Sequence, residues 1–246
     1  MAGLLKGKTA LITGAARRIG SATAKALASQ GASIVIHCRR EADAADLVAE
    51  LATLAASSWV VTADLQKPDE HERLVERALA AAGSLHILVN NASIFPAGTL
   101  DEITFADVIQ NAEVNAWVPF TLMRSFARQV SRGSIVNILD TRIGGYDWNH
   151  VAYILSKQML DSLTRMCALA YAPGITVNGV SPGLILPPPG QDMKYLEQLA
   201  QTVPLERHGG PEDVANAVLY LATNDFITGQ VIHVDGGRHL ADGTHP

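Results

Sequence analysis

The hydrophobic positions of the chain follow two alternating patterns. Short apolar runs, rich in β-branched residues, have the length of buried strands. Between them lie longer segments in which apolar residues recur at three- and four-residue spacing beside a polar face, the pattern of an amphipathic helix. The short runs predict seven strands at residues 9–13, 33–37, 59–63, 86–89, 134–139, 175–180 and 230–234. The helical pattern covers segments such as 21–29, 43–55, 70–81 and 152–170.

The alternation of strand and helix predicts the fold class. Strands joined through helices run parallel, and right-handed crossovers place the helices on both faces of the sheet. We therefore expect an α/β protein with a Rossmann-like, doubly wound parallel sheet of about seven strands. No repeat or low-complexity tract interrupts the pattern, and the proline-rich stretch 187–190 is interpreted as a loop, so residues 1–246 are predicted to form a single domain.

Composition and charge exclude several classes of function. A chain of 246 residues, 48% hydrophobic, can bury a full core. Its formal net charge of -5 at pH 7 does not suit binding to nucleic acid or to an anionic membrane, and no apolar run reaches membrane-spanning length. Neither the cysteines nor the histidines have the spacing of metal ligands, so no metal is predicted. Without a signal-peptide pattern, a soluble cytoplasmic protein is expected.

Residues suited to nucleotide binding follow the first three predicted strands, at the edge where such sheets bind ligands. The turn 13–20 leads from a strand into a helix whose free amides favour a pyrophosphate. After the second strand, Arg39 and Arg40 occupy the place of the usual NAD-binding carboxylate and suit a 2′-phosphate, so NADPH is the predicted cofactor. Asp64, after the third strand, is a candidate partner of the adenine amino group. The alternatives are a plain glycine turn, a solvated arginine pair and an exposed loop carboxylate.

Tyr153 and Lys157 are candidates for the reaction centre. Their four-residue spacing places both side chains on one face of a predicted helix, where the ammonium favours the phenolate. Such a pair is common on helices and is weak evidence alone. Its context is stronger, because several motifs stand in order along the chain: the turn 13–20, Asn90-Asn91-Ala92, Asn115, the pair itself, Ser181-Pro182-Gly183 and Asp235-Gly236-Gly237.

This order of motifs resembles the short-chain dehydrogenase/reductase family over nearly the whole length of the chain. The resemblance implies a Rossmann fold, a Tyr153–Lys157 acid system in which the lysine contacts the nicotinamide ribose, and a water-linked proton relay supported by Asn115. By analogy it also implies a homo-oligomer, either a tetramer or a dimer. The residues expected at the cofactor are Gly14, Arg17, Arg18, Ile19, His37, Arg39, Arg40, Asp64, Leu65, Asn91, Ala92, Ser93, Tyr153, Lys157, Pro182 and Gly183.

Three departures from the family pattern are informative. Arg18 replaces a glycine in the phosphate loop, and Asn91-Ala92 is followed by Ser93 and then Phe95. Asp140 stands in the place of the family's catalytic serine, thirteen residues before Tyr153. Together these departures resemble the pteridine reductase subgroup of the family.

That resemblance implies the substrate, a planar pterin or folate. Phe95 and the nicotinamide would sandwich the flat ring, and polar groups would fix its edges. Hydride would pass to the carbon of a C=N bond while Tyr153 protonates the nitrogen and Asp140 holds the tyrosine. Whether Asp140 or Lys157 dominates the pKa of Tyr153 does not follow from the sequence. The expected substrate contacts are Arg18, Ser93, Phe95, Asp140, Tyr153 and Leu184.

Two other functions remain open. One is an ordinary carbonyl reductase of the 3-oxoacyl or sugar type, which needs room for a flexible chain. The other is an NADPH-binding protein without catalytic activity, for which the loss of the serine is the main argument. Each residue also has a structural interpretation, such as loop packing for Phe95 or a bond from Asp140 to Arg142. Residues 185–198 are expected to form a substrate loop that shapes specificity, and Tyr146 and Trp148 either line the pocket or pack elsewhere.

Overall fold

A computed structural model describes residues 3–188 and 190–241 of the chain. All of its strands belong to one parallel sheet with the order β3-β2-β1-β4-β5-β6-β7. This confirms the predicted doubly wound α/β fold, and every strand end lies within two residues of its predicted position. The strands are β1 (Thr9–Ile12), β2 (Ser33–Cys38), β3 (Ser58–Thr62), β4 (Ile87–Asn90), β5 (Gly133–Ile138), β6 (Ile175–Pro182) and β7 (Val231–Val234).

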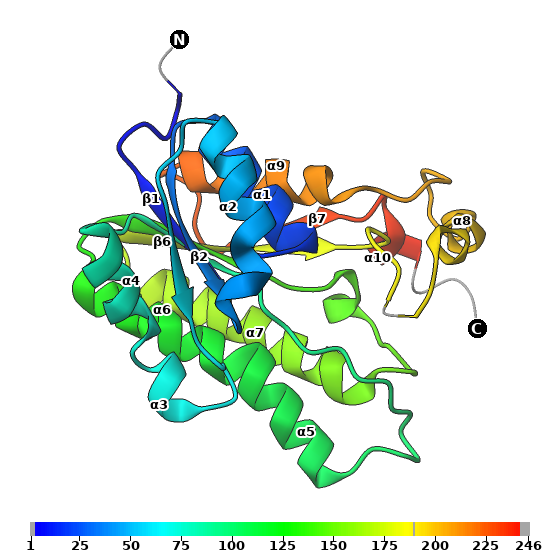
Figure 1. Ribbon diagram of the computed structural model, residues 1–246. Helices are drawn as coiled ribbons and strands as arrows, with labels where there is room; N and C mark the ends of the chain where they lie inside the picture. Colours follow the sequence, from blue (N-terminus) through cyan, green and yellow to red (C-terminus); the bar gives the residue numbers. More distant parts are fainter. Residues whose placement is uncertain (1–2, 189, 242–246) are drawn as a thin grey trace.

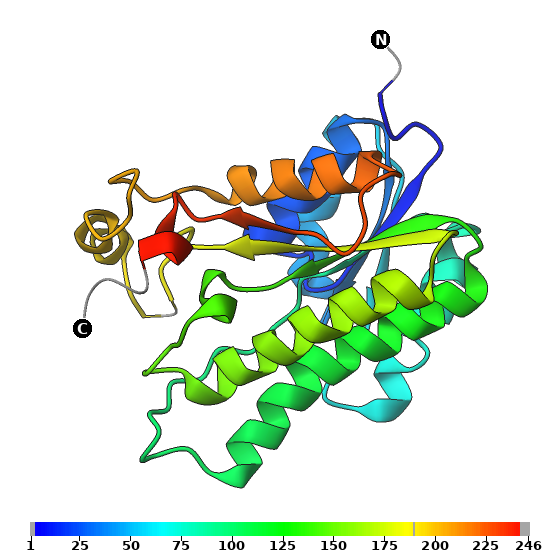
Figure 2. The same ribbon diagram turned by 180° about the vertical axis from the view of Figure 1, so that it is seen from behind.

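Helices cover both faces of this sheet (Figures 1 and 2). One face is covered by α1 (Arg18–Ser29), α2 (Ala45–Thr53) and α9 (Pro211–Thr223), and the other by α4 (Leu74–Ala82), α6 (Val118–Gln129) and α7 (Val151–Ala170). Successive strand residues enter opposite cores: Ile34 and Ile36 face α1 and α2, while Val35 faces α4. Because the central strands are buried on both sides, they are continuous apolar runs in the sequence.

Short elements connect these layers. Two of them extend the second layer: α5 (Phe105–Ala112) packs against α7, and a π-helical turn, η2 (Glu113–Trp117), joins α5 to α6. The remaining elements are α3 (Pro68–His71), α8 (Met193–Ala200), α10 (Arg238–Ala241) and the 3-10 turns η1 (Glu41–Ala44) and η3 (Thr141–Gly144).

Two sequence-based boundaries differ from the structure. The predicted helix 70–81 is divided into α3 and α4 by a turn at 72–73. Here the imidazole of His71 bonds to the carbonyl of Leu65, which holds α3 against the preceding loop. The segment 185–198, expected to be a loop, ends in α8, and residue 189 of its proline stretch lies outside the described residues. Among the described residues, no helix is both long and apolar enough to span a membrane.

Candidate active site

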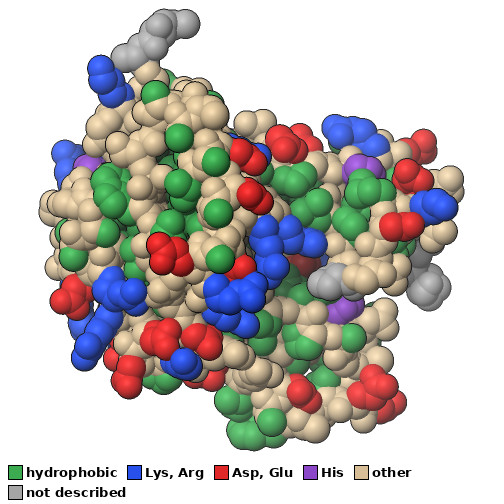
Figure 3. Space-filling view, in the orientation of Figure 1, with side chains coloured by type: hydrophobic (Ala, Val, Ile, Leu, Met, Phe, Trp, Pro, Cys, Tyr) green, Lys and Arg blue, Asp and Glu red, His purple; other side chains and the backbone are tan. Residues whose placement is uncertain are grey.

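A cavity of about 1310 Å³ lies at the carboxyl ends of the strands. Every residue predicted for the site lines this cavity except Asn115. In Figure 3 several Lys and Arg side chains gather beside the central hollow, although the chain as a whole is acidic. The fold therefore brings together candidates that come from seven separate segments of the sequence, and it gives the cavity a basic part.

The turn after β1 is shaped for close approach of a ligand to the backbone. Gly14 has a φ of +62°, and a Cβ on Gly20 would lie only 2.3 Å from the Gly14 carbonyl oxygen. The side-chain amide of Asn91 donates to the carbonyls of Thr13 and Gly14, at 2.8 and 3.1 Å. Helix α1 begins directly afterwards with no acidic residue in its first turn. Its free N–H groups are thus available to a phosphate.

Arg18 occupies a strained position in this turn. Its φ is +58°, in the left-handed region that favours glycine, which accounts physically for the glycine that the family pattern has here. Its guanidinium Nη2 donates to the carbonyl of Pro187 at 2.9 Å. Arg18 therefore joins the phosphate turn to the segment expected to shape specificity.

The arginines after β2 are not equivalent. Arg40 forms an ion pair with Asp43 at 2.7 Å, and this bond holds the pKa of the carboxyl below its ordinary value. Arg39 and Arg17 are exposed on the cavity and have no ion pair within the described part of the chain. They are the guanidiniums available to an added phosphate.

His37 lies in the cavity wall, but both of its ring nitrogens are used by the protein. Nδ1 accepts from the Gly14 N–H at 3.1 Å, and Nε2 donates to the Ala63 carbonyl at 3.1 Å. Burial lowers the pKa of His37 to about 4, so the ring is neutral at pH 7. Its role in the structure is to fasten the ends of β1, β2 and β3 together.

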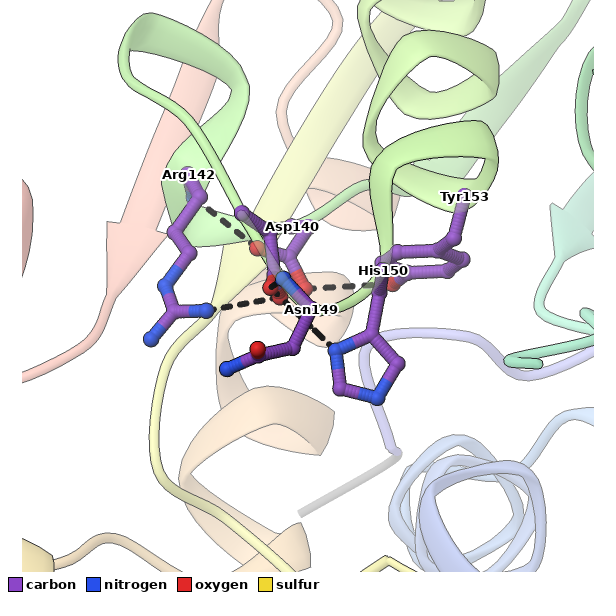
Figure 4. Close-up of polar contacts among 6 residues, drawn as sticks. Asp140, Arg142, Asn149, His150 and Tyr153 are labelled. Carbon is purple, nitrogen blue, oxygen red and sulfur yellow. Dashed lines mark hydrogen bonds and ion pairs between the residues drawn. The ribbon is translucent and has the colours of Figure 1, made fainter. Parts of the chain in front are cut away.

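The reaction centre joins β5 to α7. The Tyr153 hydroxyl donates to Asp140 Oδ2 at 3.1 Å, and the Arg142 backbone N–H donates to Asp140 Oδ1 at 2.9 Å (Figure 4). Lys157 is buried; its Nζ donates to the Ile138 carbonyl at 2.7 Å and lies 5.7 Å from the centre of the Tyr153 ring. The three residues predicted for proton transfer thus lie together.

The charges of this centre answer the question that the sequence left open. Burial, followed by the charge of Asp140, holds the pKa of Tyr153 well above 10, and the charge of Arg142 opposes them. Burial also raises the pKa of Asp140, although the Arg142 N–H, Tyr153 and Lys157 oppose it. For Lys157, burial lowers the pKa to about 8 against the attraction of Asp140. The phenol is protonated at pH 7, and Asp140 binds a proton more readily than an ordinary carboxyl.

Two residues that sequence reasoning missed complete the wall of the site. His150 stacks on Phe95 with ring centres 3.9 Å apart, and its Nδ1 lies 3.2 Å from both oxygens of Asp147. Asp147 also pairs with Arg142 at 2.6 Å (Figure 4). His150 directly precedes α7, three residues before Tyr153. This position was the one signal in the sequence that could have marked it as a site residue. From the sequence, His150 was considered only with the other histidines, which lack the spacing of metal ligands.

Asn115 has a supporting position behind the cavity. Its side chain is fully buried in the π-helical turn η2. Oδ1 accepts from the Ser93 hydroxyl and the Ile94 N–H at 3.0 and 2.9 Å, and Nδ2 donates to the Ile94 carbonyl and to Ser156. The Asn115 side chain therefore fixes the strand-end loop that carries Phe95.

The remaining candidates divide between the cavity and other contacts. The cavity wall at the end of β6 contains Pro182, Gly183 and Leu184. Asp64 also lines the cavity, and its Oδ1 accepts from the Gln66 N–H. Tyr146 and Trp148 are not among the lining residues; they are largely exposed and pack against each other. For these two, the alternative of packing outside the pocket holds.

A cluster beside the site contains His233, Asp235 and His239, whose donor atoms lie within 4.8 Å of one another. The Asp235 carboxylate already accepts from the Thr141 hydroxyl, from His239 and from the Gly237 N–H. The two imidazoles stack face to face, so their lone pairs do not converge on one point. Through Asp235, the cluster connects His239 of α10 with Thr141 of η3, the residue after Asp140. The predicted absence of a metal stays a prediction.

Comparison with known proteins identifies the family. A family model described as enoyl-(acyl carrier protein) reductase matches residues 14–239. The chain is 34% identical to 7alpha-hydroxysteroid dehydrogenase of Clostridium sardiniense, over 96% of this chain and 95% of that protein. It is 33% identical to the 3-oxoacyl-[acyl-carrier-protein] reductase FabG of Staphylococcus epidermidis, over 95% of this chain and 99% of that protein.

A solved structure matches equally well. The chain resembles FolM alternative dihydrofolate reductase 1 from Brucella suis in complex with NADP, with 33% identity, a TM-score of 0.90 and coverage of 96% of both chains. The fold, the Tyr153–Lys157 centre and these matches agree. The chain belongs to the short-chain dehydrogenase/reductase family and is an NAD(P)-dependent reductase of that family.

Proposed function

We propose that this protein is an NADPH-dependent reductase of pterins, such as dihydrobiopterin or biopterin, with dihydrofolate as a further candidate. The observation that carries the proposal is the hydrogen bond between Tyr153 and Asp140 beside the ring of Phe95, which pairs an acid with a flat apolar surface. The likeness to the Brucella alternative dihydrofolate reductase supports it.

The cofactor preference follows from the basic part of the cavity. Arg17 and Arg39 line the cavity and form no ion pair in the described ranges, and both suit a 2′-phosphate. The N–H groups at the start of α1 suit the pyrophosphate. When bound, NADPH supplies the hydride that goes to the carbon of a C=N bond in the pterin.

The source of the transferred proton follows from the protonation states of Asp140 and Tyr153. With Asp140 ionised, the Tyr153 hydroxyl donates to the carboxylate and is turned away from a substrate. Once Asp140 takes a proton, it donates to the tyrosine oxygen, and the hydroxyl is free to protonate the substrate nitrogen. The raised pKa of Asp140 favours this arrangement. Asp140 then returns its proton to the phenolate, which Lys157 stabilises.

A carbonyl reductase of the 3-oxoacyl or sugar type is the second candidate. The varied relatives favour it, because they include a hydroxysteroid dehydrogenase, a 3-oxoacyl reductase and, at 34% identity, an L-rhamnose 1-dehydrogenase. A catalytically silent NADPH-binding protein is the third. The intact contacts of Tyr153 and Lys157 argue against it.

The test is NADPH oxidation by the purified protein with dihydrobiopterin, biopterin, dihydrofolate and simple ketones. We expect turnover of the pterins, and we expect Tyr153→Phe to reduce kcat on the order of 100-fold or more, as loss of a general acid does. Asp140→Ser, which restores the residue of the family pattern, should lose pterin turnover. Reduction of ketones alone would move the protein to the carbonyl reductases, and NADPH binding without any turnover would favour the silent protein.

We also propose that the protein forms a homodimer or homotetramer. Exposed apolar side chains follow one surface of the packed elements α5, η2 and α7, which lie side by side in Figures 1 and 2. A patch of this kind suits a contact between copies of the chain. Its members are Phe105, Ile109, Trp117, Leu155, Met159, Met166 and Leu169. The two free, buried cysteines support the cytoplasm as its location.

A further inference from the structure

We infer that His150, held by Asp147, makes the site specific for flat substrates by fixing the ring of Phe95 as a preformed stacking surface. The inference rests on the proposed function and deepens it, because it names the residues that distinguish a planar heterocycle from a flexible carbonyl compound. Neither residue belongs to the acid system or to the expected cofactor contacts.

The ring of Phe95 is held by two neighbours. His150 covers one face, with ring centres 3.9 Å apart and planes inclined by 18°. The ring of Tyr153 meets Phe95 at right angles, with centres 4.6 Å apart and planes inclined by 88°. Phe95 nevertheless keeps 41% of its surface exposed and lines the cavity. The ring thus has one neighbour on a face and another at right angles, and it still presents surface to the cavity.

Backbone contacts hold the stacked pair in register. The loop after Phe95 forms an isolated parallel bridge with the segment before α7, between Gly98 and His150. The Gly98 N–H donates to the Asn149 carbonyl at 2.8 Å, and the Val151 N–H donates to the Gly98 carbonyl at 3.0 Å. On the other side of Phe95, Asn115 anchors the loop through Ile94. The position of Phe95 is therefore fixed at both ends of its loop.

Asp147 fixes the imidazole. The carboxylate is buried and accepts from the Asn149 N–H at 3.0 Å, and it also contacts Arg142 and the Nδ1 of His150. Although burial opposes ionisation, the charge of Arg142 and the other contacts hold the pKa of Asp147 below its ordinary value. Asp147 is therefore an anion that can hold both partners.

These contacts form a closed ring around the reaction centre. Arg142, which pairs with Asp147, also donates its backbone N–H to Asp140, and Asp140 accepts from Tyr153. The stacking surface and the acid are thus built on one set of side chains. The ring runs through Phe95, His150, Asp147, Arg142, Asp140 and Tyr153 and returns to Phe95.

A fixed aromatic ring favours one class of substrate. A planar heterocycle that stacks on an immobile ring loses less freedom on binding than one that must first order the ring. A flexible ketone has no extended flat surface and gains little from the same contact. Loosening Phe95 should therefore weaken binding of pterins, while NADPH binding and the chemical step are kept.

Steady-state kinetics of two His150 variants test this. His150→Ala removes the stacked ring, whereas His150→Phe keeps an aromatic layer and loses only the bond to Asp147. We expect His150→Ala to raise the KM for dihydrobiopterin about five-fold, the size of one aromatic contact. His150→Phe should raise it only about three-fold, because the aromatic layer stays while the bond that orients it is lost. Asp147→Asn, which weakens the contacts with His150 and Arg142, should also raise this KM about three-fold.

The controls separate this role from general damage. For both His150 variants, kcat with dihydrobiopterin and the KM for NADPH should stay within about two-fold of wild type. An unchanged dihydrobiopterin KM in His150→Ala, or an increase in His150→Phe equal to that in His150→Ala, would overturn the assignment to stacking. Parallel losses in kcat and in NADPH binding would make the role merely structural and overturn it as well. Wild-type pterin turnover is measured first, and its absence would reject the proposed function itself.

Discussion

At the reaction centre, Asp140 and Tyr153 share one hydrogen bond. A serine in the place of Asp140 could orient the tyrosine but would carry no charge and titrate far outside the working range. Asp140 is ionisable, its pKa is raised by burial, and its Oδ1 is already bound by the Arg142 N–H. The remaining oxygen, Oδ2, is the one that contacts Tyr153. The carboxyl group can therefore exchange a proton only with the tyrosine or with what enters the cavity.

This arrangement predicts the pH dependence of turnover. Because the proposed mechanism needs protonated Asp140 and burial raises its pKa, kcat should be highest on the acidic side and fall as the pH increases through that pKa. Asp140→Asn keeps the size and a hydrogen-bonding amide but cannot supply a proton. We expect its kcat to fall on the order of 100-fold. The decrease of kcat with increasing pH should also disappear, because the titrating carboxyl is gone. Measurement of kcat between about pH 5.5 and 9, at saturating substrates, checks this. An Asp140→Asn profile parallel to that of wild type would contradict it.

The sequence could predict Asp140 and its neighbours but not the residues behind them. Asp140, Tyr153 and Lys157 stand at a strand end and on a regular helix, so their positions follow from periodicity and motif order. Asp147 and His150 lie in an irregular segment whose pairing with the loop at Gly98 joins residues more than fifty positions apart. No local pattern in the sequence encodes such a contact.

At the scale of elements, His37 couples three strands through one neutral ring. Its two ring nitrogens connect the turn after β1 with the loop after β3, and its own carbonyl accepts from the Ala15 N–H at 3.0 Å. The two ring bonds together need the neutral ring with its proton on Nε2, because an imidazolium could not accept from the Gly14 N–H. The phosphate turn therefore depends on the charge of a residue in the next strand.

Acid should destabilise the fold through His37. Its pKa is about 4 in the folded protein against 6.5 for the ordinary side chain, so below pH 6.5 the unfolded chain binds the proton first. The stability that His37 confers is complete above pH 6.5 and is lost as the pH falls towards 4, by up to about 3 kcal/mol. Urea unfolding of wild type and His37→Gln at pH 7.5 and pH 5 measures the difference. The glutamine variant should lose less stability between the two pH values, and equal losses would show that His37 is not responsible.

The elements themselves differ in how well the sequence predicted them. The strands were predicted closely because burial on both faces leaves uninterrupted apolar runs. The helix 70–81 was wrong in its continuity, because the bond from His71 to Leu65 is a tertiary contact that apolar periodicity does not show. The π-helical turn at Asn115 was likewise invisible, since a single wide turn barely changes the spacing of apolar residues.

At the scale of the whole molecule, an exposed apolar surface on α5 and α7 lies outside the lining of the cavity. On α7, Leu169 is 84% exposed, and on the adjoining α5, Phe105 is 80% exposed. Apolar residues at helical spacing on an outer face have no role in the fold of one chain, and water penalises them. Because α7 also carries Tyr153 and Lys157, a contact between copies on this surface would brace the helix on which the chemistry depends.

A double substitution tests whether this surface joins two copies. In Met166→Glu/Leu169→Glu, two charges would have to be buried against an apolar partner, so association should weaken on the order of 100-fold or more. We expect light scattering coupled to gel filtration to show a dimer or tetramer for wild type and a smaller species for the variant. Leu54→Glu, at an exposed apolar position after α2 on the opposite face of the sheet, serves as the matched control and should keep the wild-type mass.

If the smaller species also unfolds at a lower temperature and reduces substrate more slowly, the contact supports α7 as inferred. A wild-type protein that is monomeric at micromolar concentration would mean that the apolar face has another occupant.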